Sequence, residues 1–273
     1  MAPGVAARLA RLEHGELSLL GRIRPASNVA FLADVLLDGE TADSAEPVRC
    51  IYKPISGEAP LWDFPHGQLA GREHAAFLVS DALGWDVVPP TVLREGPAGP
   101  GMVQEWQDVV LDGHPVDIVP AGRVPEGWHG IFDGLDGAEN EVTLVHDDSA
   151  VLRRIALFDV IANNADRKGS HVLRTSDGRT LGIDHGLTFH HQSKLRTVLW
   201  GWAEQPLTEG EIDDVATLLE LLLDPASALS EALAPLLIDL ELQALRGRCQ
   251  RLLRTQVFPE PGDAWPVIPW PPI

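Results

Sequence analysis

The apolar residues of this chain change their spacing along the sequence, and this change limits the folds that the chain can adopt. Before position 106, short apolar runs lie between turn residues, and in residues 29–37 one alternating set of positions is apolar throughout. After position 150, apolar residues recur every three or four positions, as in residues 150–164. Alternation is typical of strands, and the longer repeat is typical of helices. The sequence therefore predicts an α+β fold, with an antiparallel sheet first and packed helices after it.

Turn residues and caps place the expected elements. The third apolar run ends at Lys53, because Pro54 cannot donate a hydrogen bond to a neighbouring strand. Thr208 and Glu211 have the spacing of a capping box, which predicts the start of a leucine-rich helix. The expected strands are residues 17–23, 29–37, 48–52, 87–93 and 101–106, and the expected helices are residues 68–83, 150–164, 208–223 and 234–255.

Composition divides the chain into four expected segments: an N-terminal segment (1–14), a sheet-rich part (15–106), a helical part (107–258) and a proline-rich tail (259–273). The tail contains six prolines, so we expect it to be extended and to lie over the body through Trp265 and Trp270. Residues 108–148 hold ten acidic residues and one basic residue, Arg123. This stretch is expected to be a solvated connector.

Charge limits the partners of the chain. Its 273 residues include 40 acidic and 21 basic ones, which gives a net charge of −19. Nucleic acids and anionic membranes need basic residues to neutralise phosphates, so neither is an expected partner. A polyphosphate ligand would need a local basic residue or a metal ion. Two cysteines, no apolar leader and no apolar run of membrane-spanning length predict a cytoplasmic protein.

Two polar loops concentrate acidic and amide groups. The first, residues 163–171, contains Asp166, and the second, residues 182–186, contains Asp184. The short apolar runs between them predict a β-hairpin, which would bring both loops to one end of a small sheet. Two carboxylates there would serve as a base and a metal ligand. An aspartate beside glycine is also common in ordinary turns, so plain turns are the alternative.

Read in order along the whole chain, these features resemble a known family. A sheet ending in Lys53, a helix with Glu73, a strand ending in Glu105-Trp106, and the loops Asp166-Arg-Lys-Gly-Ser-His171 and Ile183-Asp-His-Gly186 resemble atypical protein-kinase-like enzymes. The motifs are most similar to those of type II phosphatidylinositol 4-kinases, including an uncharacterised actinobacterial branch, and more loosely to phosphatidylinositol 3-kinases and HipA-type kinases. Trp200-Gly-Trp202 resembles part of the short activation segment of the type II enzymes. The resemblance covers residues 15–255 and implies a bilobal fold with an antiparallel-sheet N-lobe and a mainly helical C-lobe.

The resemblance implies ATP with Mg²⁺ or Mn²⁺ as cofactors, and it implies a role for each matching residue. Lys53 would pair with the α- and β-phosphates, Glu73 would hold Lys53 by an ion pair, and the backbone of Glu105 and Trp106 would bind adenine. Asp166 would orient or deprotonate the accepting hydroxyl, Lys168 would contact the γ-phosphate, and Asp184 would bind the metal. Without the resemblance, Lys53 and Glu73 would be read as ordinary surface residues.

Two departures from the family pattern stand out. His171 takes the place of the asparagine that binds the second metal, and imidazole suits Mn²⁺ better than Mg²⁺. Residues 24–28 take the place of the glycine-rich phosphate loop and contain no glycine, so Ser27 and Asn28 would supply the donors there.

The leading hypothesis is an ATP-dependent phosphotransferase of the phosphatidylinositol 3/4-kinase-like type. Its acceptor would be a hydroxyl of a lipid headgroup, a small polyol or a protein, although the acidic surface disfavours stable membrane association. The alternatives are a nucleotide-binding pseudokinase that acts as a scaffold, and a kinase-fold enzyme that transfers AMP.

Overall fold

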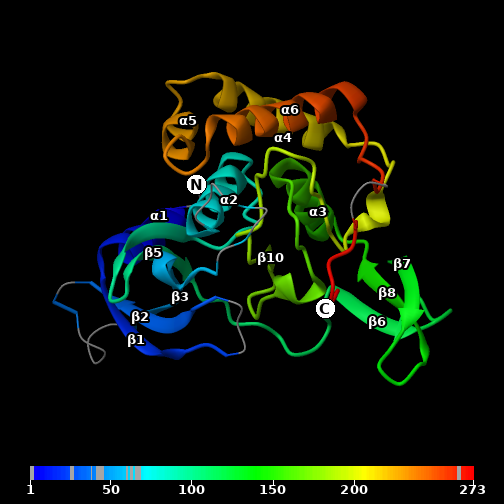
Figure 1. The fold of residues 1–273 in the computed structure, drawn as a ribbon, viewed down its shortest axis with the longest axis horizontal. Coiled ribbons are helices and arrows are strands. Elements are labelled where there is room, and N and C mark those ends of the chain that lie inside the picture. The colour runs from blue at the N-terminus through cyan, green and yellow to red at the C-terminus, as the bar shows by residue number, and fades with distance from the viewer. Residues whose placement is uncertain are drawn as a thin grey trace.

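The N-terminal half is built on a five-stranded antiparallel sheet (Figure 1). The computed structural model describes residues 3–24, 28–37, 39–40, 46–59, 61, 64, 69–262 and 266–273. The spatial order of the strands is β1-β2-β3-β5-β4, and helix α2 connects β3 to β4. The elements are α1 (Pro3–His14), β1 (Glu16–Arg22), β2 (Phe31–Leu36), β3 (Val48–Pro54), α2 (Leu69–Ala82), β4 (Thr91–Gly96) and β5 (Gly99–Glu105).

A small core lies against one face of this sheet. The alternation along β2 and β3 puts Ala33, Val35, Cys50 and Tyr52 on the buried face. Helix α1 covers this core through Leu12, which is fully buried. Residues 3–14 are therefore part of the sheet-rich half rather than a separate terminal segment, because an amphipathic helix can bury an apolar face that the sheet leaves open.

The C-terminal half is mainly helical and has its own, larger core. Ser149 caps α3, and Thr208 and Glu211 form the predicted capping box of α4. The expected helix 234–255 starts later in the structure, because α6 begins only at Asp239, and a separate short helix, α5, ends at Leu233. The elements are α3 (Ala150–Ala162), β9 (Val172–Arg174), β10 (Thr180–Gly182), α4 (Glu209–Leu223), α5 (Ala228–Leu233) and α6 (Asp239–Thr255).

Helix α2 joins the two halves. Its residues Ala76, Phe77 and Val79 belong to the larger core, although the helix lies in the chain between two strands of the sheet. The buried guanidinium of Arg72 donates to the carbonyl of Thr188 and forms an ion pair with Glu241 of α6. One core lies against the sheet and a larger one lies among the helices, which confirms the predicted bilobal α+β architecture, with an antiparallel-sheet N-lobe and a mainly helical C-lobe.

The expectation of a solvated connector over residues 108–148 is wrong. These residues contain a three-stranded antiparallel sheet of order β6-β8-β7, which lies across the molecule from β1 and β2 (Figure 1). The acidic side chains lie mostly on exposed positions, while Leu144, Val145 and His146 of the central strand are buried. Net charge therefore hid a sheet whose central strand is buried. Its strands are β6 (Val116–Pro120), β7 (Trp128–Leu135) and β8 (Glu141–Asp147).

The tail is extended and lies on the helical half, as predicted. The carbonyl of Val267 accepts hydrogen bonds from Thr197 N and Trp200 Nε1, both at 3.0 Å, and the carbonyl of Pro272 accepts one from Gly169 N at 2.8 Å. The expected anchor is different, however. Trp270 is 77% exposed, and Trp265 lies outside the described residues.

None of the helices in the described part of the chain combines the length and the apolar character needed to cross a bilayer.

Candidate active site

Lys53 is the centre of the candidate site. It lies near the end of β3, and its ammonium nitrogen lies 2.6 Å from Oε1 of Glu73 on α2 and 3.1 Å from Oδ1 of Asp184. The predicted ion pair of Lys53 with Glu73 is thus present. Burial alone would lower the pKa of Lys53, but the carboxylates of Asp184 and Glu73 outweigh it and raise the pKa above its ordinary value. Lys53 therefore carries a positive charge.

Glu73 is buried and uses both carboxylate oxygens. Oε1 accepts from Lys53, and Oε2 accepts from the backbone N–H of His185 at 2.9 Å. Burial raises the pKa of Glu73, while Lys53 and this N–H oppose the rise. The position of α2 is therefore tied to Lys53 of the sheet and to the loop that carries Asp184.

Asp184 follows β10 and is half exposed. The charge of Lys53 is the main reason why the pKa of Asp184 lies below its ordinary value. The residue has φ +59°, in the left-handed region that a residue other than glycine adopts only when its surroundings hold it there. The structure thus presents an ionised carboxylate on a strained turn.

Asp166 and Lys168 lie together in the loop after α3. Lys168 Nζ lies 3.4 Å from Oδ2 of Asp166, and the backbone N–H of Asp166 donates to Oδ1 of Asn164. Both Asp166 and Lys168 are about one-fifth exposed, at 22%. Asp166 is therefore accessible and has a basic neighbour.

His171 comes from the same loop and faces Asp184. Its Nδ1 lies 2.9 Å from the carbonyl of Asp166, so Nδ1 carries the proton and Nε2 keeps its lone pair. Nε2 lies 3.5 Å from Oδ2 of Asp184. Burial lowers the pKa of His171, Asp184 opposes this, and Arg167 adds to it. The imidazole is therefore neutral near pH 7 and has a free nitrogen ligand.

The donors of His171 and Asp184 fit a divalent ion of the kind that ATP requires. In the described residues, no three histidine, cysteine or acidic side chains gather into a metal-binding group. Ions that act with nucleotides need few protein ligands, because phosphate oxygens and water complete their coordination. One carboxylate and one neutral imidazole nitrogen are enough for that arrangement.

A cavity of about 200 Å³ lies between several of these groups, although neither Lys168 nor His171 lines it. Lys53, Glu73, Asp166 and Asp184 all line it, and so does Asn28. A larger cavity, of about 520 Å³, lies near α3, α6 and the tail, but none of the predicted site residues lines it. The smaller cavity is therefore the candidate site.

The predicted phosphate-loop residues are described only in part. Asn28 lies at the cavity, and its side-chain oxygen accepts from the backbone N–H of Ala59 at 2.8 Å. Ser27 lies outside the described residues. Glu58 also lines the cavity and accepts from the N–H groups of Leu69 and Ala70, at the first turn of α2.

The predicted adenine-binding residues have protein partners for their amides. The N–H of Glu105 donates to the carbonyl of Pro90, and the N–H of Trp106 donates to the carbonyl of Arg49, both at 2.9 Å. The N–H groups of Glu105 and Trp106, whose backbone the family resemblance assigned to adenine binding, thus already donate to backbone carbonyls. The carbonyl of Glu105 lies 3.2 Å from the side-chain nitrogen of Gln107.

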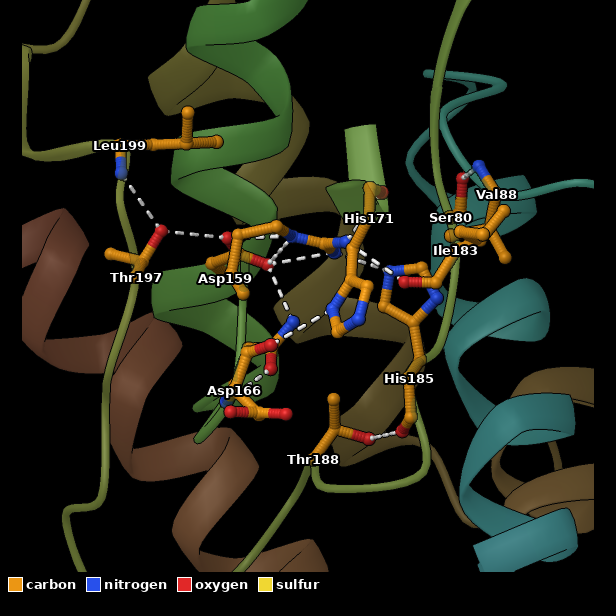
Figure 2. A network of polar contacts seen from close by, with 12 residues as sticks. Ser80, Val88, Asp159, Asp166, His171, Ile183, His185, Thr188, Thr197 and Leu199 are labelled. Carbon is orange, nitrogen blue, oxygen red and sulfur yellow. Dashed lines mark hydrogen bonds and ion pairs between the residues drawn. The ribbon is translucent and has the colours of Figure 1, made fainter. Parts of the chain in front are cut away.

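Sequence reasoning missed three residues beside the site. Asp159, Arg167 and His185 are completely buried, and Arg167 donates hydrogen bonds to both of the others. Figure 2 shows Asp159 and His185 on opposite sides of the network. One signal was available, since Asp159 is the only acidic residue in the apolar helix α3. A charged residue inside an apolar helix needs a buried partner, but the sequence does not say which one.

Comparisons with known proteins give one close relative. The chain is 48% identical over 269 residues to Protein Rv2133c of Mycobacterium tuberculosis, and the match covers 95% of this chain and 93% of that protein. No model of a known protein family matches. Among solved structures, the crystal structure of the Helicobacter pylori proinflammatory kinase CtkA matches with a TM-score of 0.40 and 9% identity, over 90% of this chain and 94% of that chain. On the strength of the sequence match, the chain belongs to the family of the Mycobacterium tuberculosis protein Rv2133c.

Proposed function

We propose that this chain is an ATP-dependent phosphotransferase that acts on a hydroxyl group. One observation carries the proposal: Lys53 bridges Glu73 and Asp184 at the wall of a cavity that also exposes Asp166. This arrangement puts a cation, a metal-binding carboxylate and a second carboxylate around one small space. Phosphoryl transfer requires mainly positioning and charge neutralisation, which such groups supply.

Lys53 would bind the phosphates of the nucleotide. Glu73 is buried and fixes the ammonium from one side, whereas Asp184 on the other side is half exposed. Because Lys53 has two carboxylate partners, it can turn from Asp184 toward a phosphate and remain paired with Glu73. Asp184 is then released to bind a cation.

Asp184 and His171 would hold Mg²⁺ or Mn²⁺. When bound, the ion would neutralise the phosphate charge, which an acidic protein with a single cavity lysine cannot do alone. Nε2 of His171 and Oδ2 of Asp184 lie 3.5 Å apart, and the proton on Nδ1 leaves Nε2 available. A nitrogen ligand favours Mn²⁺ over Mg²⁺.

Asp166 would act on the acceptor. It is accessible, and it would orient the hydroxyl and accept its proton. Lys168 beside it would contact the transferred phosphate. The resemblance of the motifs to those of phosphatidylinositol 3- and 4-kinases concerns the residues that would bind nucleotide and metal, not the acceptor. The net charge of −19 disfavours an anionic lipid headgroup as the acceptor, so a small polyol or a protein hydroxyl fits better.

A nucleotide-binding pseudokinase is the second candidate. It is favoured by the amides of Glu105 and Trp106, which have protein partners, and by His171 in place of an amide ligand. Such a protein would bind nucleotide with metal but would transfer nothing.

The test uses ATP labelled at the α- or γ-phosphate, with Mg²⁺ or Mn²⁺, and follows label on the protein and on a small-molecule fraction. We expect transfer of the γ-label, loss of transfer in Asp166→Ala, and metal-dependent ATP binding that persists in that variant. Asp112→Ala, which removes an exposed carboxylate, is the matched control and should behave as the wild type. Transfer of the α-label would indicate AMP transfer, and binding without transfer would indicate the pseudokinase.

A further inference from the structure

Arg167, the residue after Asp166, is fully buried and uses every donor that it has. Its Nε donates to Asp159 at 3.1 Å, and its Nη2 donates to Asp159 at 3.0 Å and to Nε2 of His185 at 2.7 Å. Its Nη1 donates to the carbonyls of His171 at 3.1 Å and Ile183 at 2.9 Å. A guanidinium has five N–H groups, so all five are satisfied.

The partners of Arg167 come from the two loops of the candidate site and from the helix before them. In Figure 2, Asp159 and Asp166 lie on the left, Ile183 and His185 lie on the right, and His171 lies between them. Ile183 and His185 flank Asp184 in the chain. One rigid, planar group therefore spans the loop that carries Asp166 and the loop that carries Asp184.

Asp159 holds the guanidinium in place from α3. Its two carboxylate oxygens also accept from the side chains of Asn164, at 2.9 Å, and Thr197, at 3.1 Å. The space for Arg167 is specific as well, because a Cβ at Gly182 would lie 2.9 Å from Nη2. The guanidinium has no room to move without a change in both loops.

His185 takes part as an acceptor. An arginine can only donate, so Nε2 of His185 carries a lone pair and Nδ1 carries the proton. Nδ1 is buried without a hydrogen-bond partner in the described part of the chain, which is unfavourable. The ring packs edge-on against Phe158, with centroids 5.5 Å apart, so a phenylalanine would keep an aromatic ring beside Phe158 and would have no unpaired Nδ1. It would also leave one N–H of Arg167 without a partner.

Asp184 needs support on both sides because of its left-handed backbone. On one side, the N–H of Ile183 donates to the carbonyl of His171 at 2.9 Å, and the carbonyl of Ile183 accepts from Arg167. On the other side, the N–H of His185 donates to Glu73 and its ring accepts from Arg167. Arg167 thus fixes the turn before and after the strained residue.

We propose that Arg167, held by Asp159, is the positioning residue that sets the separation of Asp166 and Asp184, and that His185 is the acceptor through which it fixes the Asp184 turn. The role in transfer rests on the function proposed above. The positioning itself does not depend on that function.

The first experiment compares His185→Phe with His185→Gln. Phenylalanine keeps an aromatic ring and removes the acceptor, and glutamine keeps an acceptor oxygen. Misplacement of catalytic groups by about 1 Å costs about 100-fold in rate. We therefore expect kcat of His185→Phe to fall by about 100-fold, with the KM for ATP within about threefold of the wild type, and His185→Gln to recover most of the loss. His74→Gln changes an imidazole that bonds to Thr91, away from both loops, and should leave kcat unchanged.

Thermal stability separates positioning from a merely structural role. If His185 only supports the fold, kcat of the two variants should follow their melting temperatures. Positioning predicts that, well below both melting temperatures, kcat of His185→Phe falls further than its loss of melting temperature accounts for, whereas kcat of His185→Gln stays close to that of the wild type. Equal kcat values in the two variants would overturn the proposal.

Hydrogen exchange tests the positioning without any turnover. In His185→Phe, the amide of Ile183, which bonds to His171, should exchange at least tenfold faster, whereas His185→Gln and the amides of α6 should match the wild type. Unchanged exchange in His185→Phe would overturn the positioning role. A wild type that shows the expected exchange pattern but transfers no phosphate would overturn only the proposed function.

Discussion

Two cationic clusters lie next to each other in this protein, and they differ in exposure. The Lys53 cluster, formed by Lys53, Glu73 and Asp184, lines a cavity, and the side chains of Lys53 and Asp184 are 27% and 50% exposed. The Arg167 cluster, formed by Arg167, Asp159 and His185, is completely buried. Water or a ligand can replace a partner in the first cluster but not in the second.

The difference follows from the cost of burying charge. A buried ion pair is retained only when its geometry is good and its remaining donors are satisfied. Arg167 meets that condition with five hydrogen bonds, whereas Lys53 has two carboxylate partners and an open side. In the Lys53 cluster, Lys53 is therefore suited to exchange a carboxylate partner for a phosphate. The Arg167 cluster is suited to hold two loops at a fixed distance.

We expect the largest loss of stability from a substitution that disrupts the Arg167 cluster. Asp159→Ala leaves the guanidinium of Arg167 buried without its counter-charge, and we expect a loss of about 3–5 kcal/mol in the free energy of unfolding. Asp184→Ala removes a half-exposed carboxylate and should change stability much less. Urea unfolding of both variants measures the difference, and equal losses would show that the two clusters do not differ as described.

His146 in β8 is another buried group, and it should make the stability of the protein depend on pH. Its Nδ1 donates to the carbonyl of Asp147 at 2.8 Å, and its Nε2 accepts from the N–H of Gly201 at 3.0 Å, so the ring is held neutral. Burial is the main cause that lowers its pKa to about 4, and the neighbouring His129 adds to it, while Asp147 and Asp148 oppose it.

Because folding lowers the pKa of His146, the protein should be less stable at acidic pH. Between about pH 6.5 and 4 the unfolded chain binds a proton at His146 and the folded chain does not, so stability falls as the pH drops. The contribution is full above pH 6.5, and about 3 kcal/mol is lost by pH 4. His146→Gln keeps an acceptor for Gly201 and cannot titrate. The difference between its unfolding curve and that of the wild type should grow over this range, and parallel curves would contradict the assignment.

A smaller change, in the affinity for ATP, tests the role of the Lys53 cluster in metal binding. Asp184→Asn should weaken binding of ATP in Mg²⁺ by about tenfold, or about 1.4 kcal/mol, because the amide is a poorer cation ligand than the carboxylate. In EDTA the variant should bind at least as well as the wild type, since a negative charge near the phosphates has gone. Calorimetry in both conditions provides the measurement. Equal ATP affinity of the wild type with and without metal would remove Asp184 from the metal site.

The smallest effect comes from a surface ion pair. Arg49 lies 3.0 Å from Asp34 across the sheet, and its side chain is 51% exposed. Exposed pairs contribute little to stability, so Arg49→Gln should leave the free energy of unfolding unchanged within the error of urea titration. A clear loss in the free energy of unfolding of Arg49→Gln would mean that exposure does not decide how much an ion pair contributes to the stability of this protein.

Several local elements of this protein could be predicted from the sequence. Alternation gave the strands of the first sheet, the helical repeat gave α2 and α3, and the spacing of Thr208 and Glu211 predicted the cap of α4. The order of motifs also identified Lys53 and Glu73 as partners, and the structure brings them together. Each of these inferences depends on residues close in the chain or on a resemblance that spans it.

Other features depend on contacts between distant parts of the chain. It showed that residues 116–147 contain a sheet, that the amides of Glu105 and Trp106 are used in strand pairing, and that Arg167 joins the two loops. The physical reason is that composition describes a segment as a whole, whereas burial acts on single side chains. An acidic stretch can still form a sheet if its central strand is buried, and a buried arginine pairs with the groups that the fold brings around it, which spacing in the sequence does not encode.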